Sequence, residues 1–338
     1  MTVSVISPGL LSSFQDQGRS GYQHLGVPVA GAMDNRAHRL ANLLAGNAED
    51  EATLEITLVG PTLRFNKAAC IAISGADLSP TINHQPVPNN RPLVLRPNDI
   101  LAFGARKTGA RAYIAWHGGI VLPSVLNSRS TCLRSGFGGF QGRALQKNDT
   151  LALACDLDAA TPESLAKALW NIKVYLPAIL GVMPRDAIRV LPTADSALFT
   201  DSAIRHFYDS EYTISPSSNR MGYRLSGQKL ALKKPVQLLS AAINFGTIQV
   251  PPDGYPITLM ADRQTTGGYP KIAHIATVDL PVVAQCMPGE TLRFKEIDLN
   301  QAQQLDSQRE EAFERLFQTL RPLRKLFEPY QRSDHDNT

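Results

Sequence analysis

Residues 95–103 read LRPNDILAF, a polar turn with an acidic residue that leads into a short apolar strand. The same order recurs at residues 145–153, LQKNDTLAL, and at residues 286–294, CMPGETLRF. A polar turn followed by a short alternating run is the pattern of a strand that starts at a tight turn. Because copies of this unit occur in both halves of the chain, the sequence predicts two related β-barrels.

Short apolar runs of strand character continue through the rest of the chain. Gly, Pro and Asn/Asp turns separate them about every ten residues, which favours antiparallel barrels over a parallel α/β sheet. Helices are expected to be few and short. Asp34 is a predicted N-cap for a helix through Ala45, and a C-terminal helix is predicted to begin near Asp298, with Gln301 placed for a capping box.

We therefore predict a mainly β protein with three parts. Residues 1–158 and 173–298 are expected to form an N-terminal and a C-terminal barrel half, and residues 299–338 a C-terminal helix and a disordered tail from 331 onward. A second pair of similar motifs supports an internal duplication of the chain. The motif RST at 129–131 is followed by GGF, and RQT at 263–265 is followed by GGY.

Composition excludes several classes of protein. The 338 residues carry a net charge of +4 that is spread along the chain, so no basic block indicates a nucleic-acid or membrane surface. No apolar run approaches the roughly 18–20 residues of a membrane span. The first residues lack the features of a signal peptide. Four cysteines without a C-x-x-C pair indicate buried, reduced thiols in a cytoplasmic protein.

Cofactor motifs are also absent from the sequence. The seven histidines show no metal-ligand spacing, so no metal site is expected. The chain has no P-loop, no dinucleotide fingerprint and no biotin-attachment lysine. If ATP or biotin takes part in the reaction, we expect another chain to supply or carry it.

The stretch with the densest chemistry is residues 262–270, DRQTTGGYP, between two strand-like runs. It places a guanidinium, an amide and two hydroxyls within four residues, and two glycines then allow the backbone to approach a ligand. Such a cluster suits a small polar ligand with a carboxylate, amide or ureido group. The alternative is a polar turn whose side chains cap their own backbone.

A polar N-terminal segment and several further motifs add up to a family resemblance. The motifs are FQDxGRxG from residue 14, GVPxxGAMD from 26, SRST from 128, SSNRMGYRL from 217, GTIQVP from 246 and MADRQTTGGYPKIA from 260. Together they resemble the biotin-dependent carboxyltransferase-like family. Its members include the C subunit of 5-oxoprolinase, the kinase-inhibitor antagonist and proteins of the allophanate hydrolase subunit 2 type. The resemblance covers roughly residues 5–296.

The resemblance implies two cyclophilin-like β-barrel domains and two partner chains, a B-type subunit, also called the kinase-inhibitor type, and an A-type subunit. The implied function is that of one component in an ATP-dependent 5-oxoprolinase complex that opens 5-oxoproline to glutamate. ATP would be used by the complex and not bound by this chain alone. One alternative is a carboxyltransferase component that acts on urea or a related amide with carboxybiotin from another chain. Another is a non-catalytic antagonist of a kinase-inhibitor-type partner.

Matching positions and side-chain chemistry nominate the site residues. The catalytic candidates are Arg263, Gln264, Thr265 and Thr266, and the substrate-binding candidates are Asp16, Arg19, Arg129, Asn219, Arg220 and Tyr269. The sequence departs from the family pattern at Ala241 and Ala242, where family members usually carry a polar or charged residue and a glycine. If that polar group does chemistry, activity in this chain is lost or altered.

Overall fold

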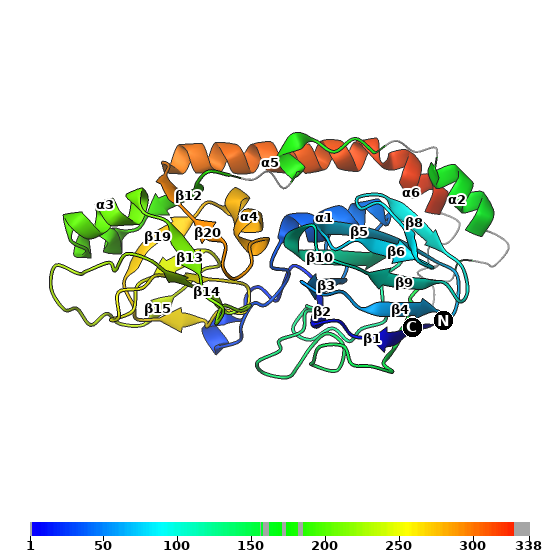
Figure 1. Cartoon of the computed structure of the whole chain (residues 1–338), viewed down its shortest axis with the longest axis horizontal. Helices are drawn as coiled ribbons and strands as arrows, with labels where there is room; N and C mark the ends of the chain where they lie inside the picture. The colour runs from blue at the N-terminus through cyan, green and yellow to red at the C-terminus, as the bar shows by residue number, and fades with distance from the viewer. Residues whose placement is uncertain (1, 156, 158–161, 171–173, 182–184, 328–338) are drawn as a thin grey trace. The chain divides into compact units, whose positions relative to one another are not determined.

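The computed structural model describes residues 2–155, 157, 162–170, 174–181 and 185–327 (Figure 1). The disordered tail expected from residue 331 lies outside the described residues. The chain forms two compact units. Unit 1 comprises Met1–Gly18, Asp34–Leu180 and Ala312–Thr338, and unit 2 comprises Arg19–Met33 and Gly181–Glu311. The units are therefore not consecutive stretches of the sequence.

Unit 1 is built on two antiparallel sheets. The six-stranded sheet has the order β11 (Thr150–Ala152), β1 (Thr2–Ser7), β4 (Thr62–Phe65), β9 (Ile100–Phe103), β6 (Pro80–Ile82) and β7 (Gln85–Pro86). The five-stranded sheet has the order β2 (Leu11–Gln15), β3 (Thr53–Thr57), β10 (Thr108–Trp116), β5 (Ala69–Asp77) and β8 (Pro92–Leu95). Their inward side chains form one hydrophobic core, in which Phe14 and Trp116 have ring centroids 6.1 Å apart.

Helix α1 (Asn35–Leu44) packs against β5 and β10 of unit 1 (Figure 1). Asp34 is its N-cap, as predicted, because the carboxylate accepts a hydrogen bond from the backbone N–H of Ala37 at 2.9 Å. Unit 1 also contains α2 (Pro162–Trp170), the short 3-10 helix η2 (Ala178–Leu180) and α6 (Arg321–Phe327). Phe327 at the end of α6 stacks on His117, with ring centroids 4.0 Å apart.

The long helix α5 (Leu299–Thr319) precedes α6 in the chain. Its start is the predicted capping box. Asp298 accepts a hydrogen bond from the N–H of Gln301 at 2.8 Å, and the Gln301 side chain accepts from the N–H of Asp298 at 3.4 Å. From Ala312 onward its residues belong to unit 1, where Phe313 lies under the Arg39 guanidinium.

Unit 2 contains one eight-stranded sheet. Its order is β20 (Thr291–Leu292), β13 (Tyr212–Ile214), β14 (Gly222–Ser226), β17 (Ile257–Leu259), β16 (Thr247–Gln249), β19 (Lys271–Ile275), β12 (Ile188–Pro192) and β21 (Phe294–Glu296). Only Arg293 separates the two end strands, β20 and β21, so the sheet nearly closes on itself as a barrel. The remaining elements are α3 (Asp201–Asp209), α4 (Leu280–Ala284), β15 (Ala241–Ala242), β18 (Thr266–Gly267), η1 (Gln23–Leu25), η3 (Ala194–Leu198) and η4 (Thr277–Asp279).

The repeated turn of the sequence is one structural unit used three times. In each copy the acidic side chain accepts a hydrogen bond from the backbone N–H three residues earlier, at 2.7 to 3.1 Å. The donor and acceptor pairs are Arg96 with Asp99, Gln146 with Asp149, and Met287 with Glu290. The residue before each acid, Asn98, Asn148 or Gly289, has a positive φ, which explains the Asn or Gly there.

The prediction of a mainly β fold of two barrel-like domains with few helices is confirmed. Where one helix was predicted near the C-terminus, two follow one another, α5 and α6. None of the four cysteines, all of which the structure describes, forms a disulfide. Cys70, Cys132 and Cys155 are buried, as expected, and Cys286 is partly buried. Across the described ranges, no helix combines the length and the apolar composition that a membrane crossing would require.

Candidate functional site

The 262–270 loop of unit 2 connects β17 to β19 and is held in place by a small two-stranded sheet. In that sheet β18 pairs with β15, so that Ala241 lies opposite Gly267 and Ala242 opposite Thr266. Both alanines are exposed. The departure from the family pattern therefore lies directly beside the loop that the sequence singled out.

The side chain of Gln23, in η1, hydrogen-bonds to the backbone next to both of these strands. Its side-chain amide donates hydrogen bonds to the carbonyl oxygens of Thr265 at 2.7 Å and Ile243 at 3.0 Å. No sequence pattern indicates this role, because Gln23 lies more than 200 positions from either partner. A segment distant in the sequence thus sets the position of the loop.

Arg220 and Asp262 form a buried ion pair at the start of the loop. The Arg220 Nε and Nη2 atoms each lie 2.9 Å from an Asp262 carboxylate oxygen, and Nη2 also donates to the carbonyl of Gly31 at 2.7 Å. The side chains are only 5% and 6% exposed. Because its guanidinium group hydrogen-bonds to Asp262 and to the carbonyl of Gly31, Arg220 positions the start of the loop.

Arg263 follows this pair and carries a buried charge of a different kind. Its Nε donates to the carbonyl of Ile243 at 3.2 Å, and the residue is 8% exposed. Among the residues that the structure describes, it forms no salt bridge. Burial lowers the pKa of Arg263 to about 10, against the opposing effect of Asp262, so it remains a cation at neutral pH. A buried cation without a carboxylate partner is suited to bind an anionic group.

Strands β16 and β19 place further polar side chains near Arg263. Thr247 Oγ1 lies 3.3 Å from Nδ1 of His274. Burial lowers the pKa of His274 and the positive charge of Arg263 lowers it further, so the imidazole is neutral at pH 7. Gln249, two residues after Thr247 in β16, is 2% exposed.

The loop side chains after Arg263 are available to a ligand. Gln264 and Thr266 are exposed, Thr265 is partly exposed and Tyr269 is 45% exposed. Within the described part of the chain, none of these four side chains makes a hydrogen bond. These four side chains therefore give no support to the alternative interpretation, a turn whose side chains cap their own backbone. Only Arg263 donates to a nearby carbonyl in the described part of this loop, that of Ala261 at 3.5 Å.

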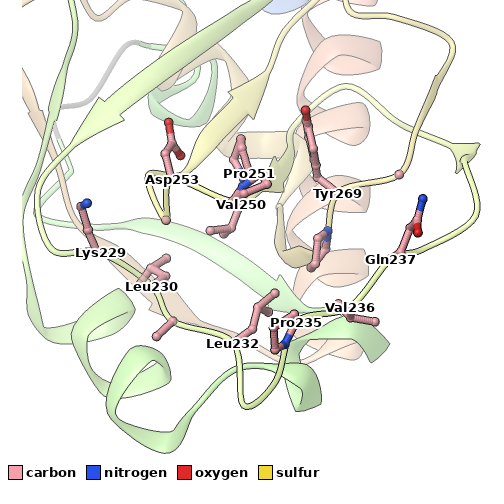
Figure 2. A pocket seen from close by; sticks show the side chains of 15 residues that line it. Lys229, Leu230, Leu232, Pro235, Val236, Gln237, Val250, Pro251, Asp253 and Tyr269 are labelled. Atoms are coloured by element: carbon pink, nitrogen blue, oxygen red, sulfur yellow. The ribbon is translucent and has the colours of Figure 1, made fainter.

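A cavity of about 670 Å³ borders the end of the loop. Figure 2 shows Leu230, Leu232, Pro235 and Val236 along one side of it, with Val250, Pro251 and Tyr269 opposite. Gly268 and Pro270 complete the lining on the loop side, and Lys229, Gln237 and Asp253 add polar groups. The cavity gives Tyr269 an apolar neighbourhood next to the polar cluster at residues 263–266.

Asp16 is the centre of a separate hydrogen-bond network in unit 1. Its carboxylate accepts hydrogen bonds from the hydroxyls of Ser128 and Ser130, at 2.8 and 2.5 Å, and from the backbone N–H groups of Gly18 and Arg129, at 2.7 and 2.5 Å. Burial alone would raise the pKa of Asp16, but these donors outweigh it and hold the pKa below its ordinary value. The Arg129 guanidinium pairs with Glu51 at 2.9 Å.

We expect Asp16 to make the stability of unit 1 sensitive to acid. Because the folded-state pKa is depressed, the ionised carboxylate stabilises the fold above the ordinary value of 3.8, and the contribution is lost as the pH falls through the folded pKa. Urea unfolding midpoints, followed by tryptophan fluorescence, should fall on acidification below about pH 4 in the wild type. The slope should be smaller in Asp16→Asn. An equal slope in both proteins would show that Asp16 has no such role.

The remaining candidates, Arg19 and Asn219, also lie in unit 2. Arg19 is almost fully buried, and its backbone N–H donates to the carbonyl of Val29 at 2.8 Å. Asn219 is exposed, and its side-chain oxygen accepts from the N–H of Met221 at 2.8 Å, which is a turn cap. The candidates thus divide between the units, with Asp16 and Arg129 in unit 1 and the other eight in unit 2. No cluster of His, Cys, Asp and Glu that could hold a metal occurs among the described residues.

Comparisons with known proteins show which family this chain is similar to. A family model described as carboxyltransferase domain, subdomain A and B, matches residues 25–296. The C subunit of 5-oxoprolinase from Haemophilus influenzae is 39% identical over 297 residues, 87% of this chain and 91% of that protein. The C subunit of 5-oxoprolinase from Escherichia coli is 34% identical over 315 residues, 93% of this chain and 97% of that protein. The crystal structure of Kluyveromyces lactis urea carboxylase superposes with a TM-score of 0.83 at 30% identity, over 93% of this chain and 29% of that chain.

Proposed function

This chain belongs to the carboxyltransferase domain family of subdomains A and B, and we propose that it is the C-type subunit of an ATP-dependent 5-oxoprolinase complex. Two proteins named as this subunit of 5-oxoprolinase match it over 91% and 97% of their own lengths. The match to urea carboxylase covers 29% of that chain. The chain therefore spans most of the length of proteins of the first kind and one region of the second.

The observation that carries the proposal is the Arg263 cation. It is buried, has no acidic partner within the described ranges and stands next to loop side chains that form no hydrogen bonds of their own. 5-Oxoproline carries one carboxylate and one lactam group. The carboxylate matches the guanidinium of Arg263, and the lactam matches neutral donors and acceptors such as Gln264, Thr265 and Thr266.

The loop can assist the reaction by binding and by orientation. Lactam opening requires the carbonyl carbon to become electrophilic and negative charge to build up on its oxygen. Donors that are already in place stabilise such charge by about 3–4 kcal/mol each. In the complex, ATP supplies the activation of the carbonyl, and the A-type and B-type partner chains supply the steps for which this chain has no motif.

Two other functions remain as defined alternatives. Similarity to urea carboxylase favours a carboxyltransferase that uses carboxybiotin from another chain. Ala241 and Ala242, which lie beside the loop in place of a polar residue and a glycine, favour a non-catalytic antagonist. Neither alternative accounts for the match to the two 5-oxoprolinase subunits over most of their length.

The test is glutamate release by the co-expressed set of subunits supplied with ATP and 5-oxoproline. We expect release that requires ATP and that avidin does not inhibit. Inhibition by avidin would support the carboxybiotin alternative. Co-purification with a kinase-inhibitor-type partner, without activity on 5-oxoproline or urea, would support the antagonist.

A further inference from the structure

Gln249 carries a buried carboxamide that the protein itself does not use. The residue is 2% exposed, and its Nε2 atom is fully buried without a hydrogen-bond partner. Within the described ranges, its side-chain oxygen makes no hydrogen bond either. A buried amide without partners costs free energy, so such groups in folded proteins call for an explanation. A ligand that supplies the missing hydrogen-bond partners is one such explanation.

The position of this carboxamide links it to the 262–270 loop. A Cβ atom built on Gly267 would lie 2.6 Å from Gln249 Nε2 and 3.3 Å from Gln249 Oε1. The same point is 3.3 Å from Nε2 of Gln264. Two side-chain amides, one buried and one exposed, therefore converge on the backbone of Gly267. Position 267, on which both amides converge, is a glycine and has no side chain.

Arg263 and Gln249 both border the two-stranded sheet of β15 and β18. The Arg263 Nε donates to the carbonyl of Ile243, directly after β15, and the Gln249 amide lies against Gly267 of β18. The charge of Arg263 also acts on His274, whose Nδ1 lies 3.3 Å from the hydroxyl of Thr247 in β16, the strand of Gln249. His274 is neutral there and adds no competing charge.

We propose that the Gln249 carboxamide recognises the lactam of the substrate, while Arg263 binds its carboxylate. The inference rests on the proposed function. A five-membered lactam holds its N–H and C=O on the same side, so a carboxamide can pair with both through two parallel hydrogen bonds. Glutamate, the opened product, has no such cis amide. The pairing therefore favours the substrate over the product and explains why the amide is kept buried without a partner from the protein.

The pairing also explains the glycine at position 267. Gly267 lies in β18 with an ordinary strand φ, so backbone conformation does not require glycine there. The available space does require glycine, because an alanine methyl group at this position would overlap the Gln249 amide. The amide is the free end of a flexible side chain, so Gly267→Ala is expected to fold and to displace the amide.

The test uses the reconstituted complex and Gln249→Met. Methionine has a similar volume and removes the unpartnered polar group, so the variant is expected to fold with a thermal midpoint at or above that of the wild type. We expect KM for 5-oxoproline to rise about 10- to 100-fold. L-proline has the carboxylate of 5-oxoproline but no lactam carbonyl, so inhibition by L-proline should be the same in Gln249→Met as in the wild type. Gln303→Met, on the exposed surface of α5, is the matched control and should behave as the wild type.

Arg263→Met provides the complementary result. It should weaken inhibition by L-proline and leave inhibition by 2-pyrrolidinone, a lactam without a carboxylate, unchanged. Gly267→Ala should raise KM for 5-oxoproline in the wild-type background and add little in the Gln249→Met background, because both changes remove the same interaction.

The outcomes separate this inference from the proposed function. If the wild-type complex opens 5-oxoproline and Gln249→Met has the wild-type KM, the lactam assignment is wrong and the proposed function stands. Additive effects of Gly267→Ala and Gln249→Met would also overturn it. If the wild-type complex forms no glutamate from 5-oxoproline, the proposed function fails and the assignment fails with it.

Discussion

Replacing Arg263 with alanine is expected to lower kcat/KM for 5-oxoproline in the reconstituted complex by about 100-fold. The figure corresponds to roughly 3 kcal/mol, the upper range for hydrogen bonds to a charged group, because Arg263 is assigned to the substrate carboxylate. The physical reason is that Arg263 is a buried cation without an acidic partner in the described part of unit 2, so the substrate carboxylate is its natural counter-ion. Steady-state glutamate formation measures the effect.

Two control variants separate charge from folding. Arg263→Lys keeps the charge and loses the planar fork, so its activity should lie between that of wild type and that of Arg263→Ala. Arg293→Ala removes an arginine that is half-exposed and paired with Glu211, and should leave turnover unchanged. Wild-type turnover by Arg263→Ala, with the complex intact, would remove Arg263 from the substrate site.

Breaking the ion pair between Arg220 and Asp262 is expected to give the largest loss of stability. Asp262→Ala leaves the buried guanidinium of Arg220 without its bidentate partner, and such losses cost about 3–5 kcal/mol. Replacing both residues with apolar ones, Arg220→Met with Asp262→Leu, should cost less than the sum of the single changes. Urea unfolding followed by circular dichroism measures these differences.

An exposed ion pair of the same unit is the control for this prediction. Arg293 and Glu211 lie 2.7 Å apart, but their side chains are 55% and 51% exposed. Glu211→Ala should therefore cost less than about 1 kcal/mol. A free energy of unfolding for Asp262→Ala as close to wild type as that of Glu211→Ala would contradict the positioning role of the buried pair.

Local patterns are sufficient to predict the elements whose stabilising contacts are themselves local. The three turn repeats, the Asp34 N-cap and the capping box at Asp298 each depend on hydrogen bonds between residues at most three positions apart. Residues so close in the chain leave a recognisable sequence pattern. The loop at 262–270 is also identifiable from composition, because its polar side chains are adjacent in the sequence.

Features that depend on distant contacts were not predicted. Residues 19–33 belong to unit 2, although they lie within the N-terminal half of the sequence. Gln23 fastens the loop from this segment, and the role of Arg220 follows from its contacts with Gly31 and Asp262. No periodicity or spacing indicates which distant residues meet in the folded chain.

Gln249 shows a different limit of prediction from sequence. A polar residue in a buried strand is usually hydrogen-bonded to a neighbour, and only the structure shows that the Gln249 amide nitrogen is buried without a partner. The alternation of Thr247, Ile248 and Gln249 is a visible signal, since two polar residues flank a core residue. The importance of Gln249 follows from the close approach of its amide to Gly267.

The rate of glutamate formation, with this chain titrated into a fixed amount of its partner chains, tests the account most directly. With ATP and 5-oxoproline present, we predict that the rate rises from background and saturates at a fixed ratio of this chain to its partners. A rate that is the same with and without this chain would contradict its assignment as a subunit of 5-oxoprolinase.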